Sequence, residues 1–246
     1  MMTGEKIRIY CLPYAGGSSA AFAEWHKFFP DNISVINPEL AGRGVRSREH
    51  FYKSIKEAAE DIYNKILFEN YDGSRFALFG HSMGCFIVYE LYKKISRNPV
   101  LKNKLVHIFM SGNYAPHLNG DPEHFAEYYK LDVDNFKDQI MGMQGTNPEI
   151  FENPVLKNYF VPIIRSDYYI TETYRTNDVV SFSCGCSVLN GLEDELTYSD
   201  LCSWKDYSPE GFEIKNFEGD HFFINEQKEK VTEYISSVLE RYERGA

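Results

Sequence analysis

The segment Gly80-His81-Ser82-Met83-Gly84 constrains the fold of this chain more than any other, because of the sequences that flank it. Residues 75–79 before it form a short apolar run that follows Asp72-Gly73-Ser74, which predicts a buried strand. Residues 85–94 after it are apolar on almost every side, which predicts a buried helix. A strand, a G-x-S-x-G turn and a helix in this order are typical of a nucleophile elbow.

In such an elbow the turn leaves no room for a side chain at Gly80 or Gly84, and it lifts the Ser82 hydroxyl clear of the sheet edge. The backbone N–H of Met83, at the start of the helix, then faces the space in front of Ser82. We expect the side chain of His81 to point away from the partner of this serine. A glycine-rich strand–helix turn without chemistry is the alternative, and the flanking strand and helix favour the catalytic interpretation.

Composition limits the classes of protein that the chain can belong to. Its 246 residues, 43% of them hydrophobic, suffice for one α/β domain with a large core. A net charge of −10 argues against nucleic acid and anionic membranes as partners, and no stretch approaches the about 20 apolar residues of a membrane helix. The five cysteines fit reduced, buried thiols of a cytoplasmic protein. Cys184-Gly185-Cys186 lacks the further ligands that a metal site needs, so no metal is expected.

Strand and helix patterns alternate along the chain, which predicts a mostly parallel central sheet with helices on both faces. The other strands are expected at 7–12, 33–36, 105–110, 183–189 and 212–217. The other helices are expected at 22–29, from Ser54 to Ile66, and from Val231 to Tyr242. Ser54 and Glu57 form a capping-box pattern at the start of the second of these helices.

The alternation stops between residues 118 and 165, where proline turns introduce helical patterns rich in aromatic residues. This segment is too long for a loop, and we expect it to be a helical lid inserted into one domain that spans residues 1–246. An ordinary second helical layer of the core is the alternative. The aromatic and Met residues of the segment predict either an apolar binding chamber or an ordinary part of the core.

A nucleophilic serine needs a general base, and the base needs an acid that orients it. Among the seven histidines, His221 is the best candidate because it follows the last predicted strand directly. His117, at the start of the insertion, is its rival. His107 lies inside a strand, and the remaining histidines outside the elbow are expected to be surface or helix residues.

The acid is expected between the serine and the histidine in the chain, after a strand. Residues 190–195, Asn-Gly-Leu-Glu-Asp-Glu, offer three acids, and we choose Asp194 over Glu193 and Glu195. A solvated acidic loop is the alternative. The small residues of the loop 14–17, after the first strand, allow a backbone N–H to reach the oxyanion beside that of Met83. Phosphate binding by this loop is disfavoured, because it lacks G-x-G-x-x-G spacing.

With these positions identified, the chain resembles, nearly end to end, the type II thioesterases of nonribosomal peptide and polyketide biosynthesis. The resemblance rests on Leu12-Pro13-Tyr14-Ala15-Gly16-Gly17-Ser18, on Leu40-Ala41-Gly42-Arg43-Gly44-Val45-Arg46, on the elbow, on Ser111-Gly112 with Ala115-Pro116-His117, on Gly145-Thr146-Asn147-Pro148-Glu149, and on Gly219-Asp220-His221-Phe222-Phe223. Ala41 stands where the family usually has proline.

The resemblance implies an α/β-hydrolase fold, a triad of Ser82, Asp194 and His221, and oxyanion donors at Met83 and Ala15. It also implies a mobile lid that opens for a phosphopantetheine arm. The acid departs from the family pattern, since the segment keeps one glycine and lacks the proline that usually follows the aspartate, so Glu193 or Glu195 stays open.

The expected function is therefore editing: hydrolysis of acyl or aminoacyl thioesters from carrier domains of a nonribosomal peptide or polyketide synthase. The protein would act in the cytoplasm as a monomer, with no cofactor of its own and with carrier domains as partners. A small-molecule esterase or lipase, a chain-terminating cyclase and a non-catalytic binding protein of the same fold are the alternatives.

Overall fold

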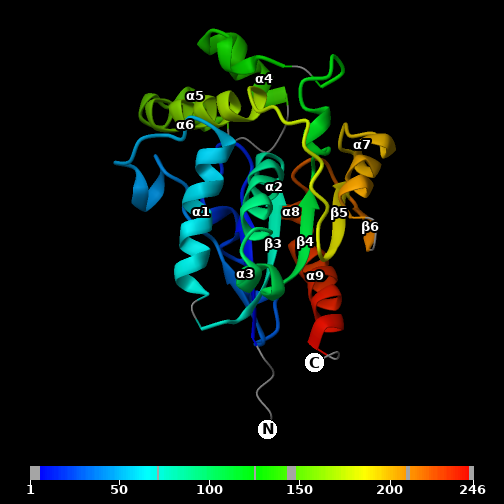
Figure 1. The fold of residues 1–246 in the computed structure, drawn as a ribbon. Helices are drawn as coiled ribbons and strands as arrows, with labels where there is room; N and C mark the ends of the chain where they lie inside the picture. The colour runs from blue at the N-terminus through cyan, green and yellow to red at the C-terminus, as the bar shows by residue number, and fades with distance from the viewer. Residues whose placement is uncertain (1–5, 71, 125, 143–147, 209–210, 244–246) are drawn as a thin grey trace.

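The computed structural model describes residues 6–70, 72–124, 126–142, 148–208 and 211–243. Its centre is a six-stranded sheet in which all neighbouring strands are parallel, in the order β2-β1-β3-β4-β5-β6 (Figure 1). The strands are β1 (Ile7–Leu12), β2 (Ile33–Ile36), β3 (Arg75–His81), β4 (Leu105–Ser111), β5 (Gly185–Gly191) and β6 (Phe212–Phe217). The predicted fold class is confirmed.

Side chains of alternate residues of each strand face opposite layers of helices. Tyr10 and Leu12 belong to the cluster that holds helices α1 (Ile55–Glu69) and α2 (Met83–Ile95). Ile9 and Cys11 belong to the cluster on the other face, with helix α9 (Lys228–Glu243). Figure 1 shows α1, α2 and α3 (Pro99–Lys104) in front of the sheet, and α8 (Phe223–Glu226) and α9 behind it.

Predicted and observed elements differ mainly at their ends. Residues 22–29 do not form one helix but two short 3-10 helices, Ser19–Phe22 and Trp25–Lys27. The strand expected at 183–189 lies two positions later, at Gly185–Gly191. The Ser54 hydroxyl caps α1 by accepting the Glu57 N–H, whereas the Glu57 carboxylate accepts the N–H of Lys53 rather than that of Ser54.

The chain segment that connects β4 to β5 forms several helices, which lie across the carboxyl ends of the strands (Figure 1). They are two 3-10 helices, Pro116–Leu118 and Tyr128–Lys130, then α4 (Val133–Gly142), α5 (Glu149–Glu152) and α6 (Pro154–Glu172). Asn153 caps α6, which continues beyond residue 165 and is long rather than short. The turn at Asp121-Pro122 leads into no helix in the part of this segment that the structure describes, and Asn147 lies outside the described residues.

The helices of this segment have an apolar cluster of their own, separate from the two clusters of the sheet. Its buried members are Phe136, Ile140, Phe151, Val161 and Ile164. A further helix, α7 (Tyr198–Cys202), and the 3-10 helix Ser203–Tyr207 connect β5 to β6.

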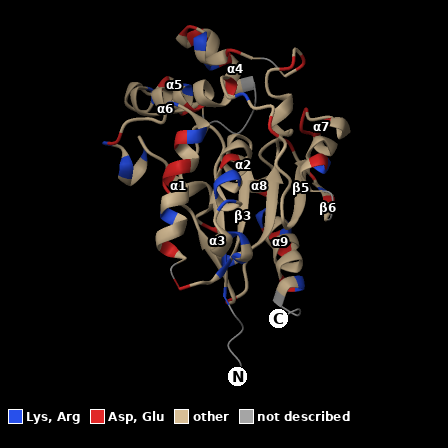
Figure 2. Cartoon of the chain, viewed as in Figure 1, with Lys and Arg blue, Asp and Glu red and all other residues tan. Residues whose placement is uncertain are grey.

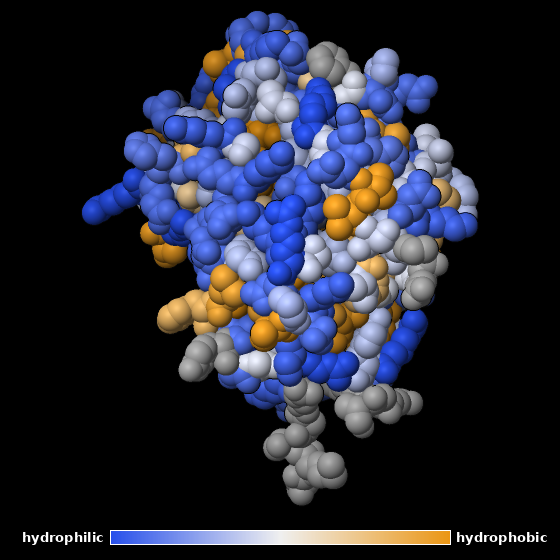
Figure 3. Space-filling model, in the orientation of Figure 1, coloured by the Kyte–Doolittle hydropathy of each residue, from blue (hydrophilic) through white to orange (hydrophobic). Residues whose placement is uncertain are grey.

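The surface carries charges of both signs. Lys and Arg alternate with Asp and Glu along α1 and α9 (Figure 2), and on the face drawn in Figure 3 the hydrophobic side chains form separate small patches. Among the described residues, no helix is long and apolar enough to cross a membrane. All five cysteines are free thiols.

Candidate active site

Ser82 occupies a strained turn between β3 and α2. Its φ of 54° is positive, and it is the one non-glycine residue with positive φ in the described part of the chain. Glycines on either side make the turn possible, since a Cβ on Gly80 would lie 2.5 Å from the Gly84 carbonyl and a Cβ on Gly84 would lie 2.2 Å from the Leu12 oxygen. Such strain in a buried turn is typical of a nucleophile elbow.

The backbone of Ser82 is fixed by the neighbouring strand β4. Its N–H donates to the Ser111 carbonyl at 2.8 Å, and its own carbonyl accepts from Asn113 Nδ2 at 2.9 Å. The sequence analysis did not select Asn113, and only its place two residues after the end of β4 could have indicated this role.

His221 and Asp194 form a pair on the two loops that follow β6 and β5. His221 Nδ1 lies 2.8 Å from Asp194 Oδ2, and the Asp194 side chain is only 6% exposed. The Leu192 and Glu193 N–H groups donate to the Phe217 and Gly219 carbonyls, so the backbone holds the two loops together. A Cβ on Gly191 would meet the Asp220 oxygen at 2.1 Å, so this position needs glycine.

The other acids of the loop are placed differently. Glu193 and Glu195 are exposed, and the structure shows the contact with His221 at Asp194. We keep Asp194 as the candidate acid.

His81 does not point away from His221, contrary to the expectation from the sequence. The two ring centroids lie 5.0 Å apart, and His81 Nδ1 lies 2.9 Å from Ser111 Oγ. Burial lowers the pKa of His81 well below its usual value, so the ring that packs against His221 is neutral.

Two further histidines have partners of their own. His117 stacks on Tyr207, and its Nδ1 lies 3.0 Å from the Tyr207 hydroxyl, which leaves it out of the candidate triad. His124 is not a plain surface residue: it stacks on Tyr114, and its Nε2 lies 3.0 Å from Asp200 Oδ1. The sequence carries no local signal for this second His–Asp pair.

The loop after β1 forms a tight turn, in which the Gly17 N–H donates to the Tyr14 carbonyl at 2.9 Å. Ala15 belongs to this turn, and both Ala15 and Met83 line the same cavity as Ser82. The turn follows β1, which pairs directly with β3, so these two candidate oxyanion donors flank Ser82 from neighbouring strands.

A cavity of about 1170 Å³ opens over the carboxyl ends of the strands and includes Ser82, Asp194 and His221 in its walls. One part of the wall is apolar and comes from the helices between β4 and β5: Ile140, Ile150, Phe160, Ile164 and Tyr168. Another part is polar: Asp121, Glu123, His124, Thr197 and Asp200. Among the described residues, no group of His, Cys, Asp and Glu side chains is arranged to hold a metal ion.

Comparison with known proteins identifies the family of the chain. The model of the thioesterase domain family matches residues 7–239. The chain belongs to this family. It is 30% identical to the gramicidin S biosynthesis protein GrsT of Aneurinibacillus migulanus, with 96% of this chain and 90% of that protein covered.

Other relatives match over similar lengths. A medium-chain S-acyl fatty acid synthase thioesterase of Anas platyrhynchos is 31% identical, with 95% of this chain and 92% of that protein covered. The crystal structure of ClbQ from the colibactin NRPS/PKS pathway has a TM-score of 0.88 and 29% identity, and covers 98% of this chain and 100% of that one. The predictions of a thioesterase, and of its likeness to type II thioesterases, are thereby confirmed.

Proposed function

We propose that the protein is an editing thioesterase that removes acyl or aminoacyl groups from the phosphopantetheine arms of nonribosomal peptide or polyketide carrier domains. The observation that carries the chemistry is the placement of a strained Ser82 and the Asp194–His221 pair in the wall of one cavity. The full-length similarity to GrsT and ClbQ supports the class of substrate.

In the proposed reaction Ser82 Oγ attacks the thioester carbonyl carbon and His221 Nε2 takes the hydroxyl proton. The N–H groups of Met83 and Ala15 hold the oxyanion of the tetrahedral intermediate. The C–S bond breaks, His221 returns the proton to the leaving thiolate, and an acyl-serine remains. Water then attacks the acyl-serine carbonyl while His221 takes its proton. The bond between the carbonyl carbon and Ser82 Oγ breaks, His221 returns the proton to Ser82 Oγ, and the carboxylic acid leaves. The Asp194 carboxylate stabilises the positive charge that forms on the His221 ring, and it fixes the tautomer of the neutral ring.

The residues 118–165 act, in this proposal, as a lid on a single domain, and their apolar cluster forms the acyl chamber. The support is that members of this cluster, such as Ile140 and Ile164, are buried against one another and also face the cavity that contains Ser82. An apolar chain would replace water there, which favours its binding by about 0.8 kcal/mol for each buried methylene.

The proposed partners are carrier domains, which bring the substrate on their own phosphopantetheine, so the enzyme needs no cofactor. We expect the enzyme to act as a monomer in the cytoplasm, where such assembly lines load their carriers.

The proposal is tested by intact-mass analysis of a phosphopantetheinylated carrier domain loaded with acetyl, incubated with the wild type and with Ser82→Ala. Loss of the acetyl mass with the wild type alone supports it, and removal of Ser82 should lower kcat by at least about 10³-fold. Hydrolysis of 4-nitrophenyl acetate without hydrolysis of the carrier thioester would favour a small-molecule esterase instead.

A second candidate is release of a medium-length acyl chain from a fatty acid synthase, which the Anas platyrhynchos relative and the apolar chamber favour. Carriers loaded with acetyl, octanoyl and dodecanoyl groups separate the two. Editing predicts that all three carriers are hydrolysed, with kcat/KM rising gradually as the chain fills the apolar chamber, whereas release predicts a sharp maximum at medium length with little hydrolysis of acetyl.

A further inference from the structure

Arg43 and Asp167 form a buried ion pair between the loop that follows β2 and helix α6. Arg43 Nη1 and Nη2 lie 2.6 and 2.7 Å from the two carboxylate oxygens of Asp167, and each side chain is 2% exposed. A guanidinium that meets a carboxylate through two parallel hydrogen bonds is fixed in orientation as well as in position.

The same two side chains also bond to the backbone of the loop after β1. The Gly16 N–H donates to Asp167 Oδ2 at 2.8 Å, and Arg43 Nη1 donates to the Gly17 carbonyl at 2.8 Å. Gly16 has a φ of 81°, and a Cβ there would lie 2.7 Å from Ile164 Cγ1. Helix α6 therefore packs directly on this loop and fixes it through polar and apolar contacts.

A buried ion pair is seldom needed for stability alone, because apolar side chains of similar size often stabilise a fold as well or better. Apolar side chains could not, however, accept a hydrogen bond from the Gly16 N–H or donate one to the Gly17 carbonyl. The Gly16 N–H is one peptide unit after the Ala15 N–H, the second oxyanion donor of the proposed mechanism, and the Gly17 carbonyl follows in the same turn. An oxyanion donor is effective only if it is held in place before the reaction.

We propose that Arg43 and Asp167 are positioning residues that hold the Ala15 N–H in the oxyanion hole and make its geometry depend on the seating of helix α6. This inference rests on the proposed function. Displacement of α6 from the loop would remove the acceptor of the Gly16 N–H, so the part of the lid that opens for the substrate is α4 and α5 rather than α6.

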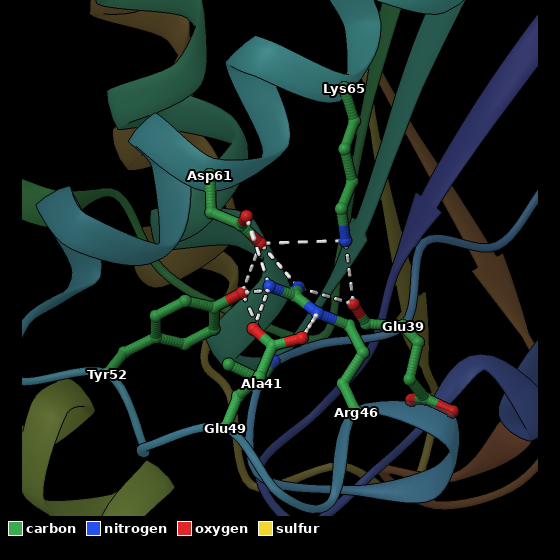
Figure 4. A network of polar contacts seen from close by, with 7 residues as sticks. All are labelled: Glu39, Ala41, Arg46, Glu49, Tyr52, Asp61 and Lys65. Atoms are coloured by element: carbon green, nitrogen blue, oxygen red, sulfur yellow. Dashed lines mark hydrogen bonds and ion pairs between the residues drawn. The ribbon is translucent and has the colours of Figure 1, made fainter.

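The control for this pair lies on the same loop. Arg46 is bonded to Asp61 of α1 and to the Glu39 carbonyl, and Tyr52 donates to Asp61 (Figure 4). This network also holds the 39–52 loop, but Asp61 bonds to none of residues 14–17 in the described structure. Asp61→Asn therefore weakens an ion pair of the same loop while it leaves the Arg43–Asp167 pair and the bonds to residues 14–17 in place.

The test uses three positioning variants: Asp167→Asn, Arg43→Lys, and a double variant that combines Arg43→Met and Asp167→Leu. Asp61→Asn and the wild type are the controls. The double variant restores apolar packing where a single change could unfold the protein. Two quantities are measured on folded protein: kcat and KM for 4-nitrophenyl acetate, and the dissociation constant of butylboronic acid, whose serine adduct mimics the tetrahedral intermediate.

We expect the three positioning variants to lower kcat by about 10- to 100-fold with little change in KM, and to weaken boronate binding by a similar factor. Asp61→Asn should keep both values. Wild-type kcat and boronate affinity in the folded double variant, or equal losses in Asp61→Asn, would overturn the inference. A wild type that cleaves neither the ester nor the carrier thioester would instead refute the proposed function, so the two failures are distinguishable.

Discussion

Asp194 Oδ2 lies 2.8 Å from His221 Nδ1, although the two residues come from loops after different strands and Asp194 is almost buried. A carboxylate in this place fixes the imidazole so that Nε2 faces the nucleophile as a base. The choice among the three acids of the segment 193–195 therefore has a direct kinetic consequence.

Asp194→Asn should lower kcat by about 10³- to 10⁴-fold, because an amide donor at Nδ1 favours the wrong tautomer of His221. The matched variants Glu193→Gln and Glu195→Gln should each change kcat by less than about tenfold, since both side chains are exposed. Steady-state hydrolysis of 4-nitrophenyl acetate measures all three. A larger loss in either glutamine variant than in Asp194→Asn would assign the acid to that position.

Gly112 should tolerate no side chain. It has a φ of 60°, and a Cβ there would lie 2.8 Å from His81 Cε1 and 3.2 Å from His221 Cε1. Gly112→Ala should therefore displace the His221 ring, lower kcat and lower the free energy of unfolding by more than the about 1 kcal/mol that positive φ alone costs an alanine.

Gly73→Ala is the control for that strain. Gly73 has a φ of 75°, and a Cβ added there would lie 3.9 Å from Lys104 side-chain atoms, which is ordinary van der Waals contact. The Gly73→Ala protein should have a free energy of unfolding about 1 kcal/mol lower than the wild type, measured by urea titration, and an unchanged kcat. If Gly112→Ala also kept its kcat, the packing of His81 and Gly112 against His221 would have no role in catalysis.

The sequence predicted the strands most closely where short, mostly apolar segments are bounded sharply, as at Ile7–Leu12 and Ile33–Ile36. It predicted one helix at 22–29, because apolar spacing does not distinguish an α-helix from two 3-10 turns. Ser82, Asp194 and His221 could be selected as candidates because each follows a strand, and the topology of a parallel sheet places such residues at one edge.

Contacts between distant segments could not be predicted in the same way. Arg43 and Asp167 stand 124 positions apart, and neither has a neighbour in sequence that indicates its partner. The packing of His81 on His221 likewise depends on how the β6 loop folds back over β3, which no local pattern records.

The acyl chamber should set the preferred chain length. Phe160 lies on α6 and lines the cavity, so Phe160→Ala should enlarge the chamber and raise kcat/KM for longer acyl groups relative to acetyl, by about 1 kcal/mol for each additional methylene accommodated. Val155→Ala, at a site 75% exposed on the same helix, is the control and should leave the profile unchanged. Rates on acetyl-, octanoyl- and dodecanoyl-carriers measure the shift, and an unchanged profile in Phe160→Ala would place the acyl chain elsewhere.

His107 should make the fold sensitive to acid. Its ring lies between Tyr242 and Ser187, at 2.9 Å from each hydroxyl, and burial lowers its pKa to about 4. Between pH 6.5 and 4 the unfolded chain binds a proton that the folded protein does not, so the free energy of unfolding should decrease as the pH falls. The part of this decrease that comes from His107 should approach about 3 kcal/mol and level off below pH 4, and buried His81 should add to the total.

Urea titrations of the wild type, of His107→Gln and of the exposed-site control His26→Gln, each between pH 7 and 4, measure this dependence. His107→Gln removes the titrating ring while keeping polar atoms near Ser187 and Tyr242, so its stability should depend less steeply on pH, whatever its stability at pH 7. His26→Gln should follow the wild type. Parallel curves for all three proteins would show that the acid sensitivity arises from other groups than the buried ring between β4, β5 and α9.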